Sequence, residues 1–559
     1  MLHGAAAGVV TERRPDINEL KITRRIVDVG GRAVHMRIMG SGPPALFVHS
    51  SPANSSYVVQ DMAAVADRYT CFAFDTPGFG LSDALPRDVL TVADLADALA
   101  DTLQAIAMPR CPVFGTHTGA SIALELAIRY PEQVTGLVLD GLASFTQDEY
   151  DRLFGEYFTK FPPDPLGGHY SSLWTRFRDQ STWFPWSARS PDALNESDLT
   201  SPHSTHQWLT MYFDAADTYA PAYRAALSYR YGPAQVHRLA VPAIFTAIES
   251  DMLYPHLSRI APVRADQEIR VVGDSLSKRR DLTREGFERF GSEGLAPQPA
   301  VKLCNGSSIV RQFIEVVDHQ LFMRSIGTTG NPTVLVVHDV PGSSQGAEAL
   351  MRRLSADHFV IAFDLPGCGE TEPLENPEIE SIARLLWRAC DALGRKGANL
   401  YGIGFGSSVA AEMAAVEPGR TRGLTFDGLL YADDAERDDL RAHFVPPITI
   451  EADGSHWFHT WQMIRDMGIW WPWYRPTRAA LRRVDADFDA VSLHLRTCAT
   501  MRQPGHHKAI VEAALKQDAA ARLKNYSGPV RFVQSSLNPL ATAYDAKLRA
   551  AFADAEWID

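Results

Sequence analysis

The 559-residue sequence contains no long hydrophobic run and no long block of one charge. The apolar stretch near its start is too short for a signal-peptide core or a membrane span, and its basic residues follow it instead of preceding it. The net charge of -13 is spread along the chain, which favours a soluble surface over binding to a polyanion. We therefore expect a cytoplasmic protein with a loose N-terminal arm that binds neither nucleic acid nor a membrane.

Cysteine is scarce, and its spacing has no pattern. The sequence contains six cysteines without a CxxC pair, and several lie in apolar, strand-like segments. They are Cys71, Cys111, Cys304, Cys368, Cys390 and Cys498. This distribution favours buried free thiols in a reducing compartment.

The chain is longer than one hydrophobic core usually supports, and it repeats itself on the scale of a domain. The segment "DTPGFGLSD" at Asp75 returns as "DLPGCGETE" at Asp364, an offset of 364 minus 75, or 289. "FVHSSP" with His49 returns at the same offset as "VVHDVP" with His338. "LVLDGLA" with Asp140 returns as "LTFDGLL" at an offset of 287.

A gapless repeat joins "HYSSLWTRFRDQSTWFPW" at His169 to "HWFHTWQMIRDMGIWWPW" at His456, with seven of eighteen positions identical. The conserved order of all these blocks indicates two homologous halves that arose by duplication and fusion. Glycine, proline and serine concentrate in residues 291–308, so we place the boundary there, between a first half of residues 1–295 and a second half of residues 296–559. We also expect the halves to pack against each other.

Each half alternates short apolar runs with helical patterns. In the first half the strand candidates are "PALFVHS", "YTCFAFD", "CPVFGT", "TGLVLDG" and "VPAIFTAIES", and "LTVADLADALADTLQAIA" has helical spacing. This rhythm predicts an α/β fold with a mostly parallel, doubly wound sheet. Ligands bind beyond the carboxyl ends of such strands. Five candidate side chains follow these strands: His49, Asp75, His117, Asp140 and Asp251.

These segments resemble the α/β-hydrolase fold superfamily, which includes haloalkane dehalogenases and epoxide hydrolases. The resemblance is carried by the His-small-x-Pro turn after an early strand, by the D-x-P-G-x-G-x-S-D segment at 75–83 and by the strand, sharp turn and helix at 113–132. It covers nearly the whole chain, twice over. It implies helical caps at about 144–240 and 431–525.

The family mechanism needs a nucleophile on the sharp turn, called the elbow, and a histidine base after the last strand. The first half has His117 at the elbow centre, between Gly115 and Gly119, and Asp251 at the acid position. No histidine occurs between His256 and His319, where the base would lie. Acyl-enzyme chemistry is not expected at this elbow, because its centre is not serine, cysteine or aspartate.

The second half departs further from the family pattern. Its elbow centre is Gly404, its acid position is Asn538, and the chain ends where the last strand would begin. Asp339 replaces Ser50 beside the presumed oxyanion hole, where a carboxylate would repel a developing negative charge. We expect this half to be catalytically inactive.

Two interpretations of His117 remain open. A helix N-terminus disfavours imidazolium, so a neutral His117 could act as a general base, oriented by Asp251 or Asp140. The N–H groups of Thr118 and Ser50, in the turn after His49, would then form the oxyanion hole. Alternatively, His117 is the remnant of a lost site. Asp140 is itself open between a second acid and an ordinary Asp-Gly turn.

The tryptophans of the repeated cap stretches include Trp183 and Trp186, which would make an apolar lid over a small apolar or aromatic ligand or would only pack the cap. Asp75 and Asp364 are taken as structural. No cofactor and no metal is expected, because His169, His203, His206 and His256 lack the tight spacing of zinc ligands. Two functions stay open: a hydrolase- or lyase-like enzyme with its site in the first half, and a non-catalytic protein that binds a ligand or partner. A homo-oligomer is possible.

Overall fold

The computed structural model describes residues 20–154, 157–195, 198–229, 235–261, 264–300 and 306–558. The chain forms two compact units. The first unit contains residues 1–158 and 214–300, and the second contains residues 159–213 and 301–559. The predicted N-terminal arm and Cys304 lie outside the described residues. The division at 295/296 stays a prediction.

The first unit is built on an eight-stranded sheet with the order β1-β2-β4-β3-β5-β6-β7-β8. Strands β1 and β2 form an antiparallel hairpin, β2 is antiparallel to β4, and the other neighbours are parallel. The strands are β1 Ile22–Val29, β2 Arg32–Gly40, β3 Pro44–Val48, β4 Thr70–Phe74, β5 Cys111–Thr116, β6 Val134–Asp140, β7 Ala243–Thr246 and β8 Gln267–Ile269. The five predicted strand segments are confirmed as β3 to β7.

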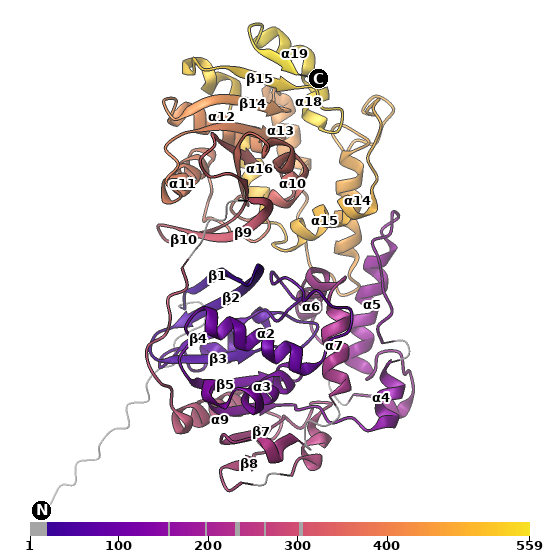
Figure 1. The fold of residues 1–559 in the computed structure, drawn as a ribbon. Helices are drawn as coiled ribbons and strands as arrows, with labels where there is room; N and C mark the ends of the chain where they lie inside the picture. Colours follow the sequence, from indigo (N-terminus) through magenta and orange to yellow (C-terminus); the bar gives the residue numbers. More distant parts are fainter. Residues whose placement is uncertain are drawn as a thin grey trace, which may run out of the picture. The chain divides into compact units, whose positions relative to one another are not determined.

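Helices cover this sheet because its strands are buried runs that need apolar partners. Figure 1 shows α2 (Val92–Ala105) and α3 (Thr118–Arg129) side by side over β3 and β5. Thr91 begins α2 with a capping box, in which its hydroxyl and the Asp94 carboxylate each accept a backbone N–H. Helices α1 (Val59–Ala63) and α9 (Leu276–Phe290) pack on a core cluster that includes Phe47 and Phe114.

The second unit repeats this architecture. Its eight-stranded sheet has the order β16-β15-β14-β13-β11-β12-β10-β9, which matches the first sheet strand for strand. The strands are β9 Gly306–Val316, β10 His319–Gly327, β11 Thr333–Val337, β12 Phe359–Phe363, β13 Ala398–Ile403, β14 Thr421–Asp427, β15 Val530–Val533 and β16 Glu556–Ile558. Its covering helices include α10 Glu348–Leu354, α11 Ile379–Ala392, α12 Gly406–Val416, α18 Pro539–Ala543 and α19 Asp545–Ala551. Two tandem α/β domains with one topology are thus confirmed.

Helical segments interrupt each sheet between its sixth and seventh strands. Between β6 and β7 lie α4 Gln147–Phe154, α5 Gly168–Thr182, α6 Pro202–Ala215 and α7 Tyr219–Ser228. Between β14 and β15 lie α13 Asp434–His443, α14 Ser455–Met467, α15 Ala490–Met501, α16 His507–Lys516 and α17 Ala519–Arg522. Residues 159–213, which carry α5 and most of α6, belong to the second unit. There α5 packs against α14 (Figure 1).

The cysteine prediction can be checked at five positions. Cys71, Cys111, Cys368 and Cys390 are buried free thiols, as the sequence predicts, whereas the free thiol of Cys498 is only partly buried. Burial raises the pKa of each of the four buried thiols, because the thiolate would lose its hydration. These side chains act as small apolar residues and not as nucleophiles.

Candidate functional site

The sharp turn predicted at His117 is present. His117 links β5 to α3 with φ 50° and ψ −112°, a strained backbone conformation for a residue with a Cβ. The two glycines of the turn are required by close packing. A Cβ at Gly119 would collide with the carbonyl oxygen of Val48, and one at Gly115 would lie 2.7 Å from the carbonyl carbon of Gly119. The turn therefore holds the imidazole at the carboxyl end of the sheet.

Asp251 reaches the elbow histidine. The Nε2 atom of His117 lies 2.7 Å from Oδ2 of Asp251, and the two side chains are 29% and 14% exposed. The backbone N–H of Leu253 donates to Oδ1 of Asp251 at 2.8 Å and fixes the carboxylate. Space for the ring is made by Gly141, where a Cβ would lie 2.5 Å from Cδ2 of His117. Of the two acids considered from the sequence, Asp251 is thus the one that bonds to the imidazole.

The expectation of a neutral His117 is wrong in direction. Burial alone would lower the pKa of His117, but the charge of Asp251 and the hydrogen bond to it, together with nearby Asp140, outweigh burial and raise this pKa above 6.5. The same pairing lowers the pKa of Asp251, against its own burial. The carboxylate therefore has a larger effect on the imidazole than the end of α3 does.

Asp140 has a different partner from the one proposed. Its carboxylate is buried and forms an ion pair with Arg279, and the hydroxyl of Thr116 donates to it at 3.1 Å. Arg279 also pairs with buried Asp61, which makes a buried acid-base-acid triad. Sequence reasoning missed Arg279, although it lies in "DSLSKRRD", the segment where the family base was sought. The basic run in this segment without histidine, which forms the start of α9, was the available signal.

His49 lies in the turn after β3 and hydrogen-bonds to the backbone on both of its ring nitrogens. Thr76 donates its backbone N–H to Nε2 of His49 at 2.9 Å, so Nδ1 carries the proton and donates to the carbonyl oxygen of Ser50 at 2.8 Å. Burial lowers the pKa of His49, in keeping with a neutral ring. Both nitrogens are used in binding the backbone, and His49 therefore positions the turn. Asp75 is structural as predicted, because its buried carboxylate accepts from His35 at 2.7 Å and from Leu81 N–H at 2.9 Å.

In the second half, the side chain of Asp339 accepts two backbone N–H groups beside the elbow. Oδ1 of Asp339 accepts from the backbone N–H of Val340 at 2.8 Å and from that of Phe405 at 3.0 Å. Arg496 holds the other carboxylate oxygen, with Nη2 lying 3.0 Å from Oδ2. The sequence predicted that Asp339 would repel an incoming charge; in the structure it occupies both donors itself.

Gly404 lies at the strand-to-helix turn of the second half, as predicted, with φ +55°. A methyl group does not fit this turn, because a Cβ at Gly404 would collide with the carboxylate of Asp339. Asn538, at the acid position, donates from its side chain to the carbonyl oxygen of Asp427 at 2.6 Å. Burial and the charge of Asp339 raise the pKa of Asp427 to about 6.

Trp183 and Trp186 belong to the second unit, where Trp183 forms a β-bridge with Leu194 and Trp186 lies near the guanidinium of Arg176 at 5.6 Å. Their role in a lid over His117 stays a prediction. Among the described residues, no group of three or more histidine, cysteine, aspartate or glutamate side chains could hold a metal ion. The described helices include none with the length and apolarity of a membrane span.

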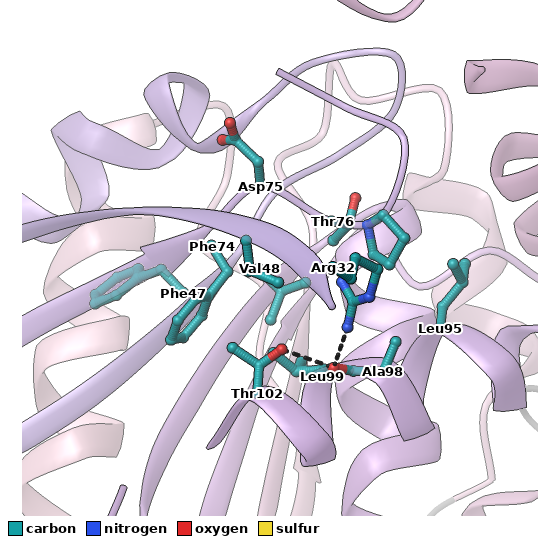
Figure 2. Close-up of a pocket in the computed structure, with 12 residues that line it drawn as sticks. Arg32, Phe47, Val48, Phe74, Asp75, Thr76, Leu95, Ala98, Leu99 and Thr102 are labelled. Atoms are coloured by element: carbon teal, nitrogen blue, oxygen red, sulfur yellow. Dashed lines mark hydrogen bonds between the residues drawn. The ribbon is translucent and has the colours of Figure 1, made fainter. Parts of the chain in front are cut away.

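A cavity in the first unit lies between the sheet and α2 (Figure 2). Figure 2 shows Arg32 and Thr102 both directed at Ala98, whose carbonyl oxygen accepts from Arg32 Nη2 at 3.3 Å and from Thr102 Oγ1 at 2.8 Å. The remaining lining is mostly apolar and includes Phe47 and Leu99. None of its described lining residues belongs to the elbow or to the loop with Asp251, so this cavity is a packing gap away from the dyad.

The comparison with known families matches each half of the chain separately. A family model described as "alpha/beta hydrolase fold" matches residues 43–265 and again 332–548. A 2-(acetamidomethylene)succinate hydrolase of Mesorhizobium japonicum is 33% identical over 128 residues, which are 23% of this chain and 45% of that protein. Haloalkane dehalogenase 2 of Mycobacterium tuberculosis is 27% identical over 125 residues, which are 22% of this chain and 44% of that protein. The chain thus spans less than half the length of these curated relatives.

The chain also aligns with solved structures. A laboratory-evolved variant of potato epoxide hydrolase aligns with 48% of this chain and 99% of its own length, at 20% identity and a TM-score of 0.38. An epoxide hydrolase from Vigna radiata aligns with 48% of this chain and 98% of its own length, at 17% identity and a TM-score of 0.37.

Proposed function

The chain belongs to the α/β-hydrolase fold family, and on that basis we propose that it is a hydrolase- or lyase-like enzyme for a small apolar molecule, with one non-serine site at His117. The observation that carries the proposal is the 2.7 Å contact between His117 Nε2 and Asp251 Oδ2 on a strained elbow. Strain of this kind clusters at sites where it holds a side chain for chemistry. The hydrolase among the relatives supports the same general class.

In the proposed mechanism the dyad works as a base and its orienter. Asp251 accepts the proton on Nε2 of His117, which leaves Nδ1 as the atom that can take a proton. In hydrolysis, Nδ1 would remove a proton from water while the water oxygen attacks an electrophilic carbon; the imidazolium would then return the proton to the leaving group. In a lyase-like reaction, Nδ1 would take the proton from a carbon acid.

The second half indicates which backbone groups would stabilise negative charge in the first. Val340 and Phe405 donate their N–H groups to one carboxylate oxygen of Asp339. The offsets of 289 and 287 map these residues to Ser51 and Thr118. We therefore place the second donor of the oxyanion hole at Ser51 instead of Ser50, with Thr118 as first donor.

The second half is proposed to be inactive. Its elbow has no side chain, and Asp339 fills the pair of N–H groups that an oxyanion would need. Arg496 pairs with the same carboxylate and thereby stabilises it in place. The alternative function is a protein that binds a ligand or partner without turnover. The filled N–H pair of the second half favours this alternative for that half, and it would hold for the whole chain if the first half were also inactive.

A substrate screen with matched variants tests the proposal. Apolar esters, epoxides, haloalkanes and activated carbonyl compounds are assayed with the wild type, His117→Ala and a control, His319→Ala, which removes an exposed histidine of the second half. Loss of a general base should lower the rate by about a hundredfold to ten-thousandfold, and the control should keep full activity. Turnover retained in His117→Ala would place the chemistry elsewhere, and no turnover with any class would favour the non-catalytic alternative.

A further inference from the structure

Two cap helices of the second unit, α5 and α14, come from the gapless repeat and pack against each other. Tyr170 and Trp457 stack with their ring centroids 5.6 Å apart and their planes 16° apart. Their numbers differ by 287, so each ring meets its own counterpart in the other repeat. In a two-fold interface only residues on the axis do this. The stack therefore marks an internal two-fold axis between the repeats.

The contacts away from this axis are reciprocal. Nε2 of His169 lies 3.0 Å from Nδ1 of His494, and Nε2 of His456 lies 3.2 Å from Nδ1 of His206. His169 corresponds to His456 at an offset of 287, and His206 corresponds to His494 at an offset of 288. The same bond is thus formed twice, once in each direction across the axis.

A second reciprocal pair involves glycines. Gly167 and Gly454 precede α5 and α14 with φ +79° and +78°. A Cβ at Gly167 would lie 2.8 Å from Cε3 of Trp461, and a Cβ at Gly454 would collide with Cγ of Trp174. Both pairs are related by the offset of 287. Each repeat therefore has a glycine whose missing side chain leaves room for a tryptophan of the other repeat.

The hydrogen bonds require neutral histidines of one tautomer. The backbone N–H of Asp164 donates to Nδ1 of His169 at 3.1 Å, so Nε2 carries the proton that is donated to His494. The backbone N–H of Glu451 donates likewise to Nδ1 of His456 at 3.1 Å. His456 then donates to His206, which donates from Nε2 to the carbonyl oxygen of Met501 at 3.0 Å.

Burial keeps this histidine cluster (His169, His206, His456 and His494) uncharged. It lowers the pKa of His169, His206 and His456 to about 4 and that of His494 to about 3. Each packed element brings further titratable or charged groups: Asp164 before α5, Tyr170 and Arg178 on α5, His203 on α6, Asp453 and His459 at α14, and Cys498 on α15. Asp164 and Asp453 favour protonation, whereas His203 and His459 oppose it.

We propose that the described part of residues 159–213 and helices α14 and α15 form an internal copy of a two-fold dimer interface, closed by two reciprocal bonds between neutral histidines. The partner of the first repeat is the second repeat of the same chain. The catalytically silent half thereby keeps a binding role, that of holding residues 159–213. This inference does not depend on chemistry at His117.

The interface should open in acid. An added proton on Nδ1 of His494 or His206 would face the Nε2–H donor of His169 or His456, and that reciprocal bond would be lost. A proton on Nδ1 of His169 or His456 would face a backbone N–H donor. Because the folded pKa values lie below 6.5, the unfolded segment binds more protons as the pH falls. The stability of the interface is therefore present above pH 6.5 and is lost between about 6.5 and 4.

Hydrogen exchange of the full chain, corrected for the intrinsic rate at each pH, tests this inference. In the wild type, protection of α5 and α14 should fall together between pH 6.5 and 4 while strand β11 keeps its protection. Independence of pH in this range, or a change in one helix alone, would overturn the proposal. Because this measurement needs no variant, it stands even where a substitution prevents folding.

Reciprocal variants sharpen the test at pH 7.5. His206→Ala and His494→Ala each remove one of the two bonds, and either should lower protection in both α5 and α14 by roughly five- to hundredfold. His203→Ala, an exposed histidine on the same helix as His206, is the control and should change neither. If His494→Ala affected only α5 and His206→Ala affected only α14, the two bonds would not belong to one interface.

Discussion

The contact between His117 Nε2 and Asp251 Oδ2 determines which ring nitrogen is available for chemistry. A carboxylate that accepts from Nε2 stabilises the imidazolium and orders the ring, so Nδ1 becomes the working atom. The raised pKa of His117 has a cost for a general base, because the base is active only above that pKa. At the residue scale, the dyad therefore predicts activity on the alkaline side of 6.5.

Asp251→Asn tests this pairing in solution. In the wild type, NMR titration should place the pKa of His117 above 6.5, and turnover should rise as the pH increases through it. Without the carboxylate charge, burial dominates, and the pKa should fall below the wild-type value. Because the wild-type pKa is raised on folding, protonation of His117 stabilises the fold below pH 6.5, and this contribution is lost as the pH rises through the folded pKa.

The titration separates the dyad from the proposed function. The pKa shift in Asp251→Asn is measured without any substrate, so it can succeed even if no turnover is found. An unchanged pKa in this variant would mean that the dyad contact is absent in solution.

Local sequence predicted the elbow but not its electrostatics. The glycines at 115 and 119 identified the turn, and the loop position after β7 identified Asp251. The protonation of His117 depends on Asp251, which is 134 positions away in the sequence. The 2.7 Å separation of their side-chain atoms could not be inferred from either segment alone. Arg279 was missed for the same reason, since its partners Asp140 and Asp61 lie on other elements.

At the element scale, two glycines with positive φ lie in turns with different surroundings. Gly141 follows β6 with φ +61°, and the space of its missing Cβ is taken by the ring of His117. Gly30, in the β1–β2 hairpin, has φ +62° and no heavy atom within 4 Å of a Cβ placed there. The two positions thus share backbone strain but differ in their surroundings.

Gly141→Ala and Gly30→Ala form a matched pair. Both should lose about 1–2 kcal/mol of unfolding free energy from a left-handed alanine, and only Gly141→Ala should lose more because its methyl group displaces His117. Denaturant unfolding gives the free energies, and the NMR titration of His117 reports the displaced ring. Equal destabilisation with an unchanged His117 signal would show that the elbow tolerates the methyl group.

The strands themselves were predictable from short-range pattern. Buried parallel strands such as β3 to β6 are continuous apolar runs, which sequence identifies directly. The hairpin β1–β2 was not predicted, because its charged residues, such as Arg24 and Arg37, interrupt the apolar pattern. The association of residues 159–213 with the second unit has no local pattern at all, since it depends on contacts across hundreds of residues.

At the scale of the whole molecule, the two repeats differ in their elbow residues but share a packing surface. The first sheet carries the strained histidine and its acid, whereas in the second Asp339 accepts the N–H groups of Val340 and Phe405. The packing surface has been kept in both repeats, whereas the elbow histidine and its acid are replaced by Gly404 and Asn538 in the second. Fusion favours such an interface because it replaces association between two molecules with a contact inside one chain.

The last prediction concerns the first half alone. A fragment of residues 1–300 retains every kind of residue used in the interface, namely Gly167, His169, Tyr170, Trp174 and His206. Since the contacts are reciprocal, a second copy of the fragment can supply what α14 and α15 supply in the full chain. Tyr170 would then stack on Tyr170, and His169 would donate to His206 of the other copy. We therefore expect the fragment to form a homodimer.

Light scattering coupled to size-exclusion chromatography measures this directly. Gly167→Leu in the fragment is the matched variant, because its side chain would occupy the place of the facing tryptophan and should leave a monomer. Acidification from pH 7.5 to 4.5 should dissociate the wild-type dimer for the same reason that it opens the full chain: the buried histidines become charged. A soluble wild-type fragment that stays monomeric at neutral pH would contradict the two-fold origin of the interface.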